Sequence, residues 1–84
     1  MKVEVLGPGC AKCKKLYESA LEAKKELPPE VEVVKVEEIG RMTQVGMWSS
    51  PGLVVDDCLV SQGRLLSSSD IVQLVRDRLA ESGS

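Results

Sequence analysis

The feature that most constrains this chain is a strand–helix–strand pattern in its first 36 residues. Lys2 to Leu6 alternates charged residues with valine, which predicts a strand, and Gly7-Pro8-Gly9 breaks it. Pro28-Pro29 ends a helical segment that begins at Cys10 and whose apolar stripe consists of Cys13, Leu16, Ala20, Ala23 and Leu27. The valine-rich run Val31 to Val36 supplies a second strand. Because such crossovers join parallel strands and are almost always right-handed, the pattern predicts a parallel βαβ unit.

The middle of the chain predicts a shorter helix followed by a hairpin. Glu37 to Val45 has the spacing of a short helix, and its inward-facing residues would be Ile39, Met42 and Val45. Ser49-Ser50-Pro51-Gly52 has the composition of a loop. A turn at Asp56-Asp57 then separates two short strands, with Cys58 opening the return; the strands span Leu53 to Val55 and Leu59 to Ser61.

The last predicted element is a helix with a clear start. Ser67 and Asp70 have the spacing of a capping box. The residues that follow at helical spacing are Ile71, Leu74, Val75, Arg78 and Leu79. We expect Glu81 to Ser84 to fray. The predicted order is β-α-β-α-β-β-α, an α/β fold in a single domain that spans residues 1–84.

Composition and charge exclude several classes of protein. The net charge of −2 provides no basic footprint for nucleic acid, and the chain has no histidine to act as a base or a metal ligand. The N-terminal residues lack the apolar segment of a signal peptide, and no run of about 18 apolar residues could span a membrane. We therefore expect a cytoplasmic protein, a compartment in which close cysteines more often do chemistry than staple a fold.

The motif Cys10-Ala11-Lys12-Cys13 carries the predicted chemistry. At a helix N-terminus, unpaired N–H groups and the helix dipole stabilise a thiolate, and a nearby lysine such as Lys12 adds to this effect. Helical geometry predicts Cys10 at the exposed tip and Cys13 one turn further, on the buried stripe. We therefore expect Cys10 to be the nucleophile and Cys13 to be the resolving thiol. Gly9, with Gly7, lets the backbone turn tightly and leaves the first sulfur open to a bulky partner.

The same spacing of cysteines also suits soft metals. The alternative function is therefore a binding or carrier protein that holds Cu(I), Zn or a heavy metal between Cys10 and Cys13. Small carriers of that kind run β-α-β-β-α-β and end on a strand, whereas this chain is predicted to end on a helix. A cysteine pair at the start of a helix within a βαβ unit favours thiol–disulfide exchange. On that interpretation the chain requires no metal and no cofactor.

These motifs together resemble a known family. The motifs are the strand ending in Gly7-Pro8-Gly9, the segment from Cys10 to Leu16, the segment from Ser50 to Asp56, and Gly63-Arg64. They are similar to those of the very small thioredoxin- and glutaredoxin-like redox-active disulfide proteins of archaea and bacteria. The resemblance covers nearly the whole chain at the level of element order.

The resemblance implies a thioredoxin-like fold, in which a mixed four-stranded sheet of order 2-1-3-4 carries helices on both faces. It also implies that Pro51 is cis and lies against the disulfide, whereas from the residues alone Pro51 is an ordinary trans turn proline. In the cis geometry the backbone of Ser50 would face the sulfurs and pair with an extended substrate. The implied activity is thiol–disulfide exchange by a monomer, with disulfide-containing proteins as substrates and a thiol reductase as a second partner.

Two residues have more than one interpretation. Cys58 is either a hairpin residue with no task or a third metal or redox ligand, although the predicted turn would keep it out of disulfide range of Cys10 and Cys13. Trp48 is either a docking platform on the surface beside Pro51 or a core residue, since it is the largest side chain in a chain without phenylalanine.

Overall fold

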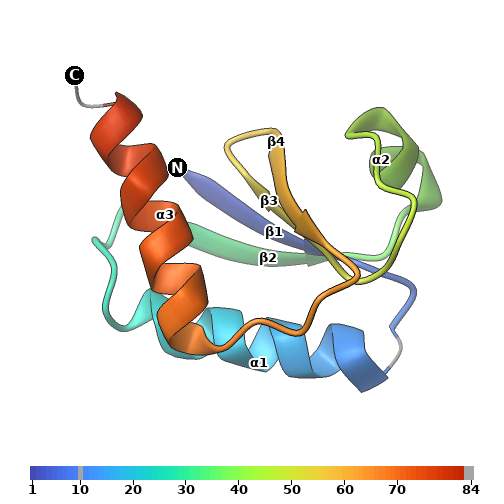
Figure 1. The fold of residues 1–84 in the computed structure, drawn as a ribbon, viewed down its shortest axis with the longest axis horizontal. Helices are drawn as coiled ribbons and strands as arrows, with labels where there is room; N and C mark the ends of the chain where they lie inside the picture. The colour runs from blue at the N-terminus through green and yellow to red at the C-terminus, as the bar shows by residue number, and fades with distance from the viewer. Residues whose placement is uncertain (10, 83–84) are drawn as a thin grey trace.

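The computed structural model describes residues 1–9 and 11–82, and Figure 1 shows their arrangement. Within these residues four strands and three helices follow one another in the predicted order. The strands are β1 (Lys2–Leu6), β2 (Glu32–Val36), β3 (Gly52–Val55) and β4 (Cys58–Gln62). The helices are α1 (Ala11–Lys24), α2 (Ile39–Gln44) and α3 (Ser68–Ser82). None of these helices is both long enough and apolar enough to span a membrane.

The strands form one mixed sheet in the order β2-β1-β3-β4. β1 is a central strand, and it pairs in parallel with β2, where Val3 lies opposite Val33. It also pairs in antiparallel fashion with β3, where Val5 lies opposite Leu53. β3 and β4 form the hairpin. The mixed sheet of order 2-1-3-4 implied by the family resemblance is therefore confirmed.

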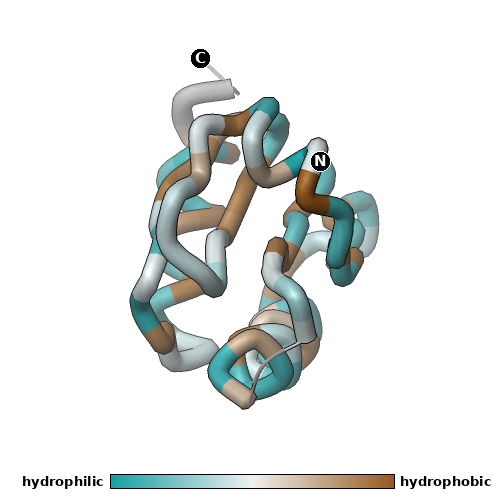
Figure 2. Tube along the Cα trace, turned by 90° about the vertical axis from the view of Figure 1, so that its right-hand side faces the viewer, coloured by the Kyte–Doolittle hydropathy of each residue, from teal (hydrophilic) through white to brown (hydrophobic). Residues whose placement is uncertain are grey.

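The two faces of the sheet are covered unequally (Figure 1). α1 and α3 pack together on the face that carries Val3, Val5 and Val55, and their residues form the larger core cluster. α2 covers part of the other face, over a smaller cluster centred on Leu6, Met42 and Val54. This division follows from β1, whose successive side chains point to opposite faces. Figure 2 shows α1 end-on, with both hydrophobic and hydrophilic segments in its turns. Its buried residues recur at helical spacing, as in an amphipathic helix; they are Cys13, Leu16, Ala20 and Ala23.

The hairpin turn at Asp56-Asp57 is confirmed. Val55 pairs directly with Cys58 across the turn. Asp56 and Asp57 have φ values of 53° and 66°, the two consecutive left-handed residues that a two-residue type I′ turn requires. Aspartate tolerates this region better than most residues because its short side chain can bond locally. Cys58 therefore opens β4, as predicted.

The capping box at the start of α3 is also confirmed. The hydroxyl oxygen of Ser67 accepts a hydrogen bond from the amide of Asp70 at 3.2 Å, and the Asp70 carboxylate accepts one from the amide of Ser67 at 3.3 Å. α3 buries Ile71 and Val75 from the predicted stripe. The helix continues through Ser82, past the residue at which fraying is predicted to begin. Residues 83 and 84, which are also predicted to fray, lie outside the described residues.

α1 ends earlier than the proline pair predicts. Its last residue is Lys24, and the amides of Lys25, Glu26 and Leu27 each bond to the carbonyl three residues earlier. The chain therefore tightens into a turn before Pro28, which disfavours helical backbone in the residue that precedes it. Leu27 is still buried, so the apolar stripe extends past the end of the helix.

The prediction that Ile39 faces inward is wrong. Ile39 is 75% exposed, whereas Met42 is buried and Val45 packs against the smaller cluster. Ile39 is the first residue of α2, which is six residues long, and it does not belong to the apolar cluster that α2 covers. Helical spacing shows which residues share a face, but it does not show where the surface beneath that face stops.

Arg41 attaches α2 to the sheet through charge. Its guanidinium donates hydrogen bonds to both carboxylate oxygens of Glu4, at 3.0 and 2.6 Å, and to the carboxylate of Asp57 at 2.6 Å. Glu4 is 3% exposed in the middle of β1, so Arg41 compensates a buried charge. The hydrogen bonds to Glu4, and next to Asp57, raise the pKa of Arg41 above its ordinary value. The guanidinium is therefore charged at every practical pH.

Replacing Arg41 with methionine should lower the melting temperature more than the control Lys25→Met. The first change leaves the buried carboxylate of Glu4 without its ion-pair partner. The control breaks a pair with Glu22 whose side chains are 72% and 64% exposed, and should shift Tm by less than about 4 °C. Differential scanning calorimetry measures both shifts, and equal shifts would contradict the assignment.

The same comparison should not depend on pH in the neutral and mildly basic range. Because the pKa of Arg41 is raised, its contribution to stability is complete below the ordinary arginine value and is lost only as the pH rises through the raised one. The difference between wild type and Arg41→Met should therefore stay constant between about pH 7 and about pH 9.

Candidate active site

Three segments of the chain meet at one end of the sheet. Gly7-Pro8-Gly9 follows β1, Cys13 lies in the first turn of α1, and Ser50-Pro51 precedes β3. β1 and β3 are antiparallel, and Leu6 pairs with Gly52. The C-terminal end of β1 and the N-terminal end of β3 therefore lie at the same end of the sheet. Topology therefore brings together the motifs that the sequence analysis singled out separately.

Gly7 is the point of contact between these segments. Its N–H donates to the carbonyl of Val36 at 3.0 Å, which continues the pairing of β1 with β2. A Cβ at this position would collide with Sγ of Cys13 and would lie 3.9 Å from Cα of Pro51. Only a glycine fits, so the cysteine and the proline both approach the same piece of backbone.

Gly9 is required for a different reason. Its φ of +88° lies in the left-handed region, where a side chain is disfavoured. A Cβ here would make only ordinary contacts, the nearest at 3.7 Å from a carboxylate oxygen of Glu37, so the φ value and not a lack of space requires glycine. This positive φ value allows the tight turn that the sequence predicts at Gly9.

Cys13 occupies the third position of α1 and is 3% exposed. It lies on the buried stripe with Leu16, as predicted. The first turn of α1 contains no acidic residue, and the neighbouring Lys12 is exposed. Cys10, which precedes α1 in the sequence, lies outside the described residues.

The peptide bond between Ser50 and Pro51 is cis. Pro51 is fully buried and its Cα approaches Gly7 from the side opposite to β2, whereas Ser50 is exposed. The segment therefore combines a buried proline beside the cysteine helix with an exposed residue directly before it.

The sequence analysis missed Gln62, which supports this segment. Its side-chain oxygen accepts hydrogen bonds from the backbone amides of Trp48 and Ser49, at 2.9 and 3.2 Å. Gln62 pairs with Gly52 across the hairpin. Counting the register outward from the Asp56-Asp57 turn would have placed Ser61, not Gln62, opposite Gly52, because the pairing shifts by one residue between Val54 and Leu53.

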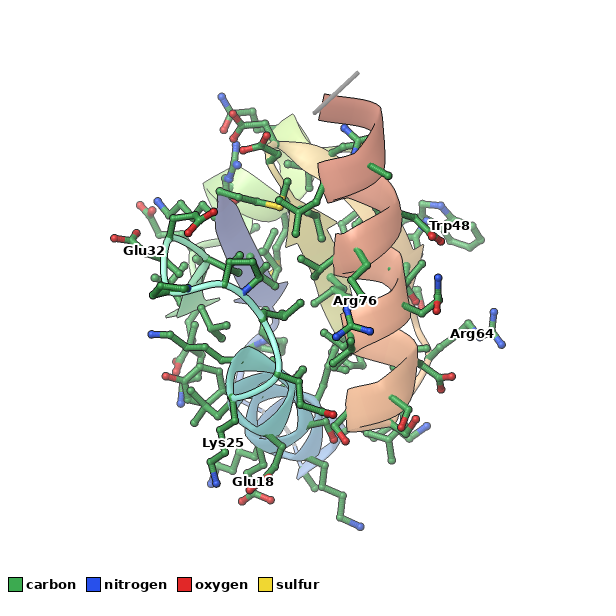
Figure 3. All side chains as sticks on the ribbon, turned by 90° about the vertical axis from the view of Figure 1, so that its left-hand side faces the viewer. Glu18, Lys25, Glu32, Trp48, Arg64 and Arg76 are labelled. Carbon is green, nitrogen blue, oxygen red and sulfur yellow. The ribbon has the colours of Figure 1, made fainter. Side chains whose placement is uncertain are left out.

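Trp48 is 85% exposed, so the interpretation of Trp48 as a core residue is wrong. Figure 3 shows its side chain pointing away from the fold on the same side as Arg64. Trp48 borders a recess of about 320 Å³ whose other lining residues are Pro8, Ile39, Met42, Thr43, Met47, Ser49 and Ser50. The recess adjoins the candidate active site, because Pro8 and Ser50 belong to both. A larger recess of about 750 Å³ lies beside α1, and none of Gly7-Pro8-Gly9, Cys13 and Ser50-Pro51 lines it.

Cys58 lies at the opposite end of β3 from the candidate active site. It pairs with Val55, whereas the site adjoins Gly52. The length of β3, at about 3.3 Å per residue, separates the two by about 10 Å, and a disulfide requires Cα atoms within about 7 Å. In the part of the chain that the structure describes, no group of three or more His, Cys, Asp or Glu side chains is arranged to hold a metal ion.

Comparisons with known proteins agree with this geometry. A family model described as a thioredoxin domain matches residues 1–76. A thioredoxin of Methanothermobacter thermautotrophicus is 37% identical over 75 residues, which cover 89% of this chain and 97% of that protein. A thioredoxin of Methanocaldococcus jannaschii is 30% identical over 77 residues, which cover 92% of this chain and 88% of that protein.

A solved structure supports the same fold. Thioredoxin 1 from the thermophilic eubacterium Thermosipho africanus TCF52B matches with a TM-score of 0.66 over 100% of both chains, at 20% sequence identity. The family model includes all three segments that meet at Gly7, and the first archaeal relative is similar over nearly its whole length. The chain therefore belongs to the thioredoxin family, a family of thiol–disulfide oxidoreductases.

Proposed function

We propose that this chain reduces disulfide bonds in proteins, with Cys10 as the nucleophile and Cys13 as the resolving thiol. The observation that carries the proposal is the burial of Cys13 against Gly7 in the first turn of α1. A thiol that is 3% exposed cannot meet a bulky substrate, but it can attack a sulfur held beside it. Cys10 follows Gly9 and precedes two exposed residues, Ala11 and Lys12, which suits the outer thiol of such a pair.

The exchange has two steps. The thiolate of Cys10 attacks one sulfur of the substrate disulfide, a mixed disulfide forms, and the other substrate sulfur leaves as a thiolate. The thiolate of Cys13 then attacks the sulfur of Cys10, which releases the second substrate thiol and leaves a Cys10–Cys13 disulfide. Two electrons pass from the protein to the substrate, and a thiol reductase returns them. Lys12 and the N-terminal turn of α1 favour the thiolate, and no cofactor takes part.

Protein substrates would bind beside the cysteines. The exposed backbone of Ser50, next to cis Pro51, suits pairing with an extended polypeptide, strand to strand. Trp48 offers a large, exposed and amphipathic surface at the edge of the same site. We place the protein in the cytoplasm, where reduced thiols persist, and expect it to act as a monomer.

Iodoacetamide at limiting concentration and neutral pH should modify Cys10 well before Cys13. Alkylation requires access to a thiolate, and the burial of Cys13 denies that access. Peptide mapping by mass spectrometry measures the modification of each cysteine over time, with half-buried Cys58 as an internal reference. Equal modification of Cys10 and Cys13, or faster modification of Cys13, would overturn the assigned roles.

Cys13→Ser should accumulate a mixed disulfide with a protein substrate, whereas Cys10→Ser should accumulate none. Without the resolving thiol the first step goes to completion and the second cannot occur. Non-reducing gel electrophoresis after incubation with insulin detects the adduct. A soft-metal carrier would instead lose metal equally in both variants. If neither variant traps a substrate and the reduced wild type binds Cu(I) or Zn tightly, the metal-binding function is correct.

Cys58→Ser should leave both the reduction potential and the exchange rate of the Cys10–Cys13 pair unchanged. The length of β3 keeps Cys58 outside disulfide range of the candidate active site. A half-buried thiol can still link two chains in air, so oxidised wild type should contain some reducible dimer that the variant lacks. Peptide mapping of air-oxidised protein is the measurement, and a link from Cys58 to Cys10 or Cys13 within one chain would contradict the expectation.

A further inference from the structure

Gln62 connects the edge of the sheet to the loop before Pro51. It is the last residue of β4 and is half-buried. Its side-chain oxygen accepts from two consecutive backbone amides, those of Trp48 and Ser49, which lie between α2 and β3. The hydrogen bond to the Trp48 amide is exposed and the one to the Ser49 amide is part-buried, so loss of the acceptor would be costlier at Ser49, where water has less access to the amide.

Gly63 holds the other side of the same segment. Its amide donates to the carbonyl of Pro51 at 2.8 Å. Its φ of +68° and its close approach to the hydroxyl of Ser49, which would overlap a Cβ at this position, require glycine. Gln62 and Gly63 therefore fix the backbone before Ser50 at two amides and the backbone after Ser50 at one carbonyl.

We infer that Gln62 is a positioning residue for protein substrates, which holds the backbone from Trp48 to Ser50 ready to pair with an extended polypeptide. The inference rests on the proposed function, since it assigns a positioning residue to the same site. Both hydrogen bonds described for the Gln62 side chain go to the loop, so we expect Gln62 to act on the reaction through the loop. Its removal should therefore slow reaction with a protein disulfide and spare a small disulfide that needs no backbone pairing.

The test compares three variants, two at Gln62 and one at Gln73, each with the Cys10–Cys13 pair reduced. Gln62→Met removes the acceptor oxygen at nearly constant size. Gln62→Glu keeps it, because a carboxylate accepts both amide hydrogens. Gln73→Met makes the same chemical change on exposed α3, where the Gln73 side chain bonds only to Asp77 at 2.9 Å among the contacts described, and so controls for the substitution itself.

Second-order rate constants are measured with insulin and with 5,5′-dithiobis(2-nitrobenzoic acid). Gln62→Met should lower the insulin rate by about tenfold and change the small-disulfide rate by less than about twofold. Gln62→Glu should restore the insulin rate, and Gln73→Met should match wild type. Because Trp48 is the single tryptophan of the chain, its fluorescence anisotropy should decay faster in Gln62→Met and return to the wild-type decay in Gln62→Glu.

The possible failures are distinguishable. An unchanged insulin rate in Gln62→Met would overturn the inference and leave the proposed function intact. Equal slowing with both disulfides, or no rescue by Gln62→Glu at an unchanged melting temperature, would show a structural role only and would also overturn it. A wild-type protein that reduces neither disulfide would overturn the proposed function itself.

Discussion

The close contact between Gly7 and Cys13 is the constraint on which the site depends. A side chain at position 7 would take the place of the sulfur, so the end of β1 and the first turn of α1 can approach each other only at a glycine. Pro51 reaches the same backbone from β3. One residue without a side chain thus links helix packing to the assembly of the candidate active site.

The two faces of the sheet are held by different forces. α1 and α3 are attached by a continuous apolar core, which includes Leu16, Ile71 and Val75. α2 has far less apolar surface, and Arg41 attaches it by a bidentate ion pair with buried Glu4. The recess beside Trp48 lies on this second side. The side of the sheet that carries this recess is therefore built around a few directional contacts, while the scaffold on the other face relies on non-directional burial.

The parts of the fold that could be predicted have local signals in the sequence. The apolar period of α1, the capping box at Ser67 and the turn at Asp56-Asp57 each depend on residues close together in the chain. The missed features depend on which distant segments meet. An alternating strand gives no sign that Glu4 will be buried by Arg41, and β4 gives no sign that Gln62 will support a loop thirteen residues earlier.

The same distinction applies to the candidate active site. The burial of Cys13 could be predicted because the stripe of α1 specifies it. The contact of Cys13 and Pro51 with a common glycine could not, because it follows from the antiparallel pairing of β1 with β3. The sequence likewise did not decide whether Trp48 is buried or exposed. Its burial depends on how far the sheet extends beneath the loop that follows α2. The roles of Cys10 and Cys13 stay predictions.

Asp57 serves two demands that favour different residues. Its φ of 66° suits glycine, whereas its ion pair with Arg41 requires an acid with a short side chain. Neither demand alone would select aspartate, but the two together do. The two positions should therefore vary together among relatives: an arginine at position 41 should coincide with an acid at position 57, and loss of the arginine should allow glycine there. The residue at this surface turn would therefore depend on the arginine of α2, the helix that packs on the face of the sheet opposite the main core.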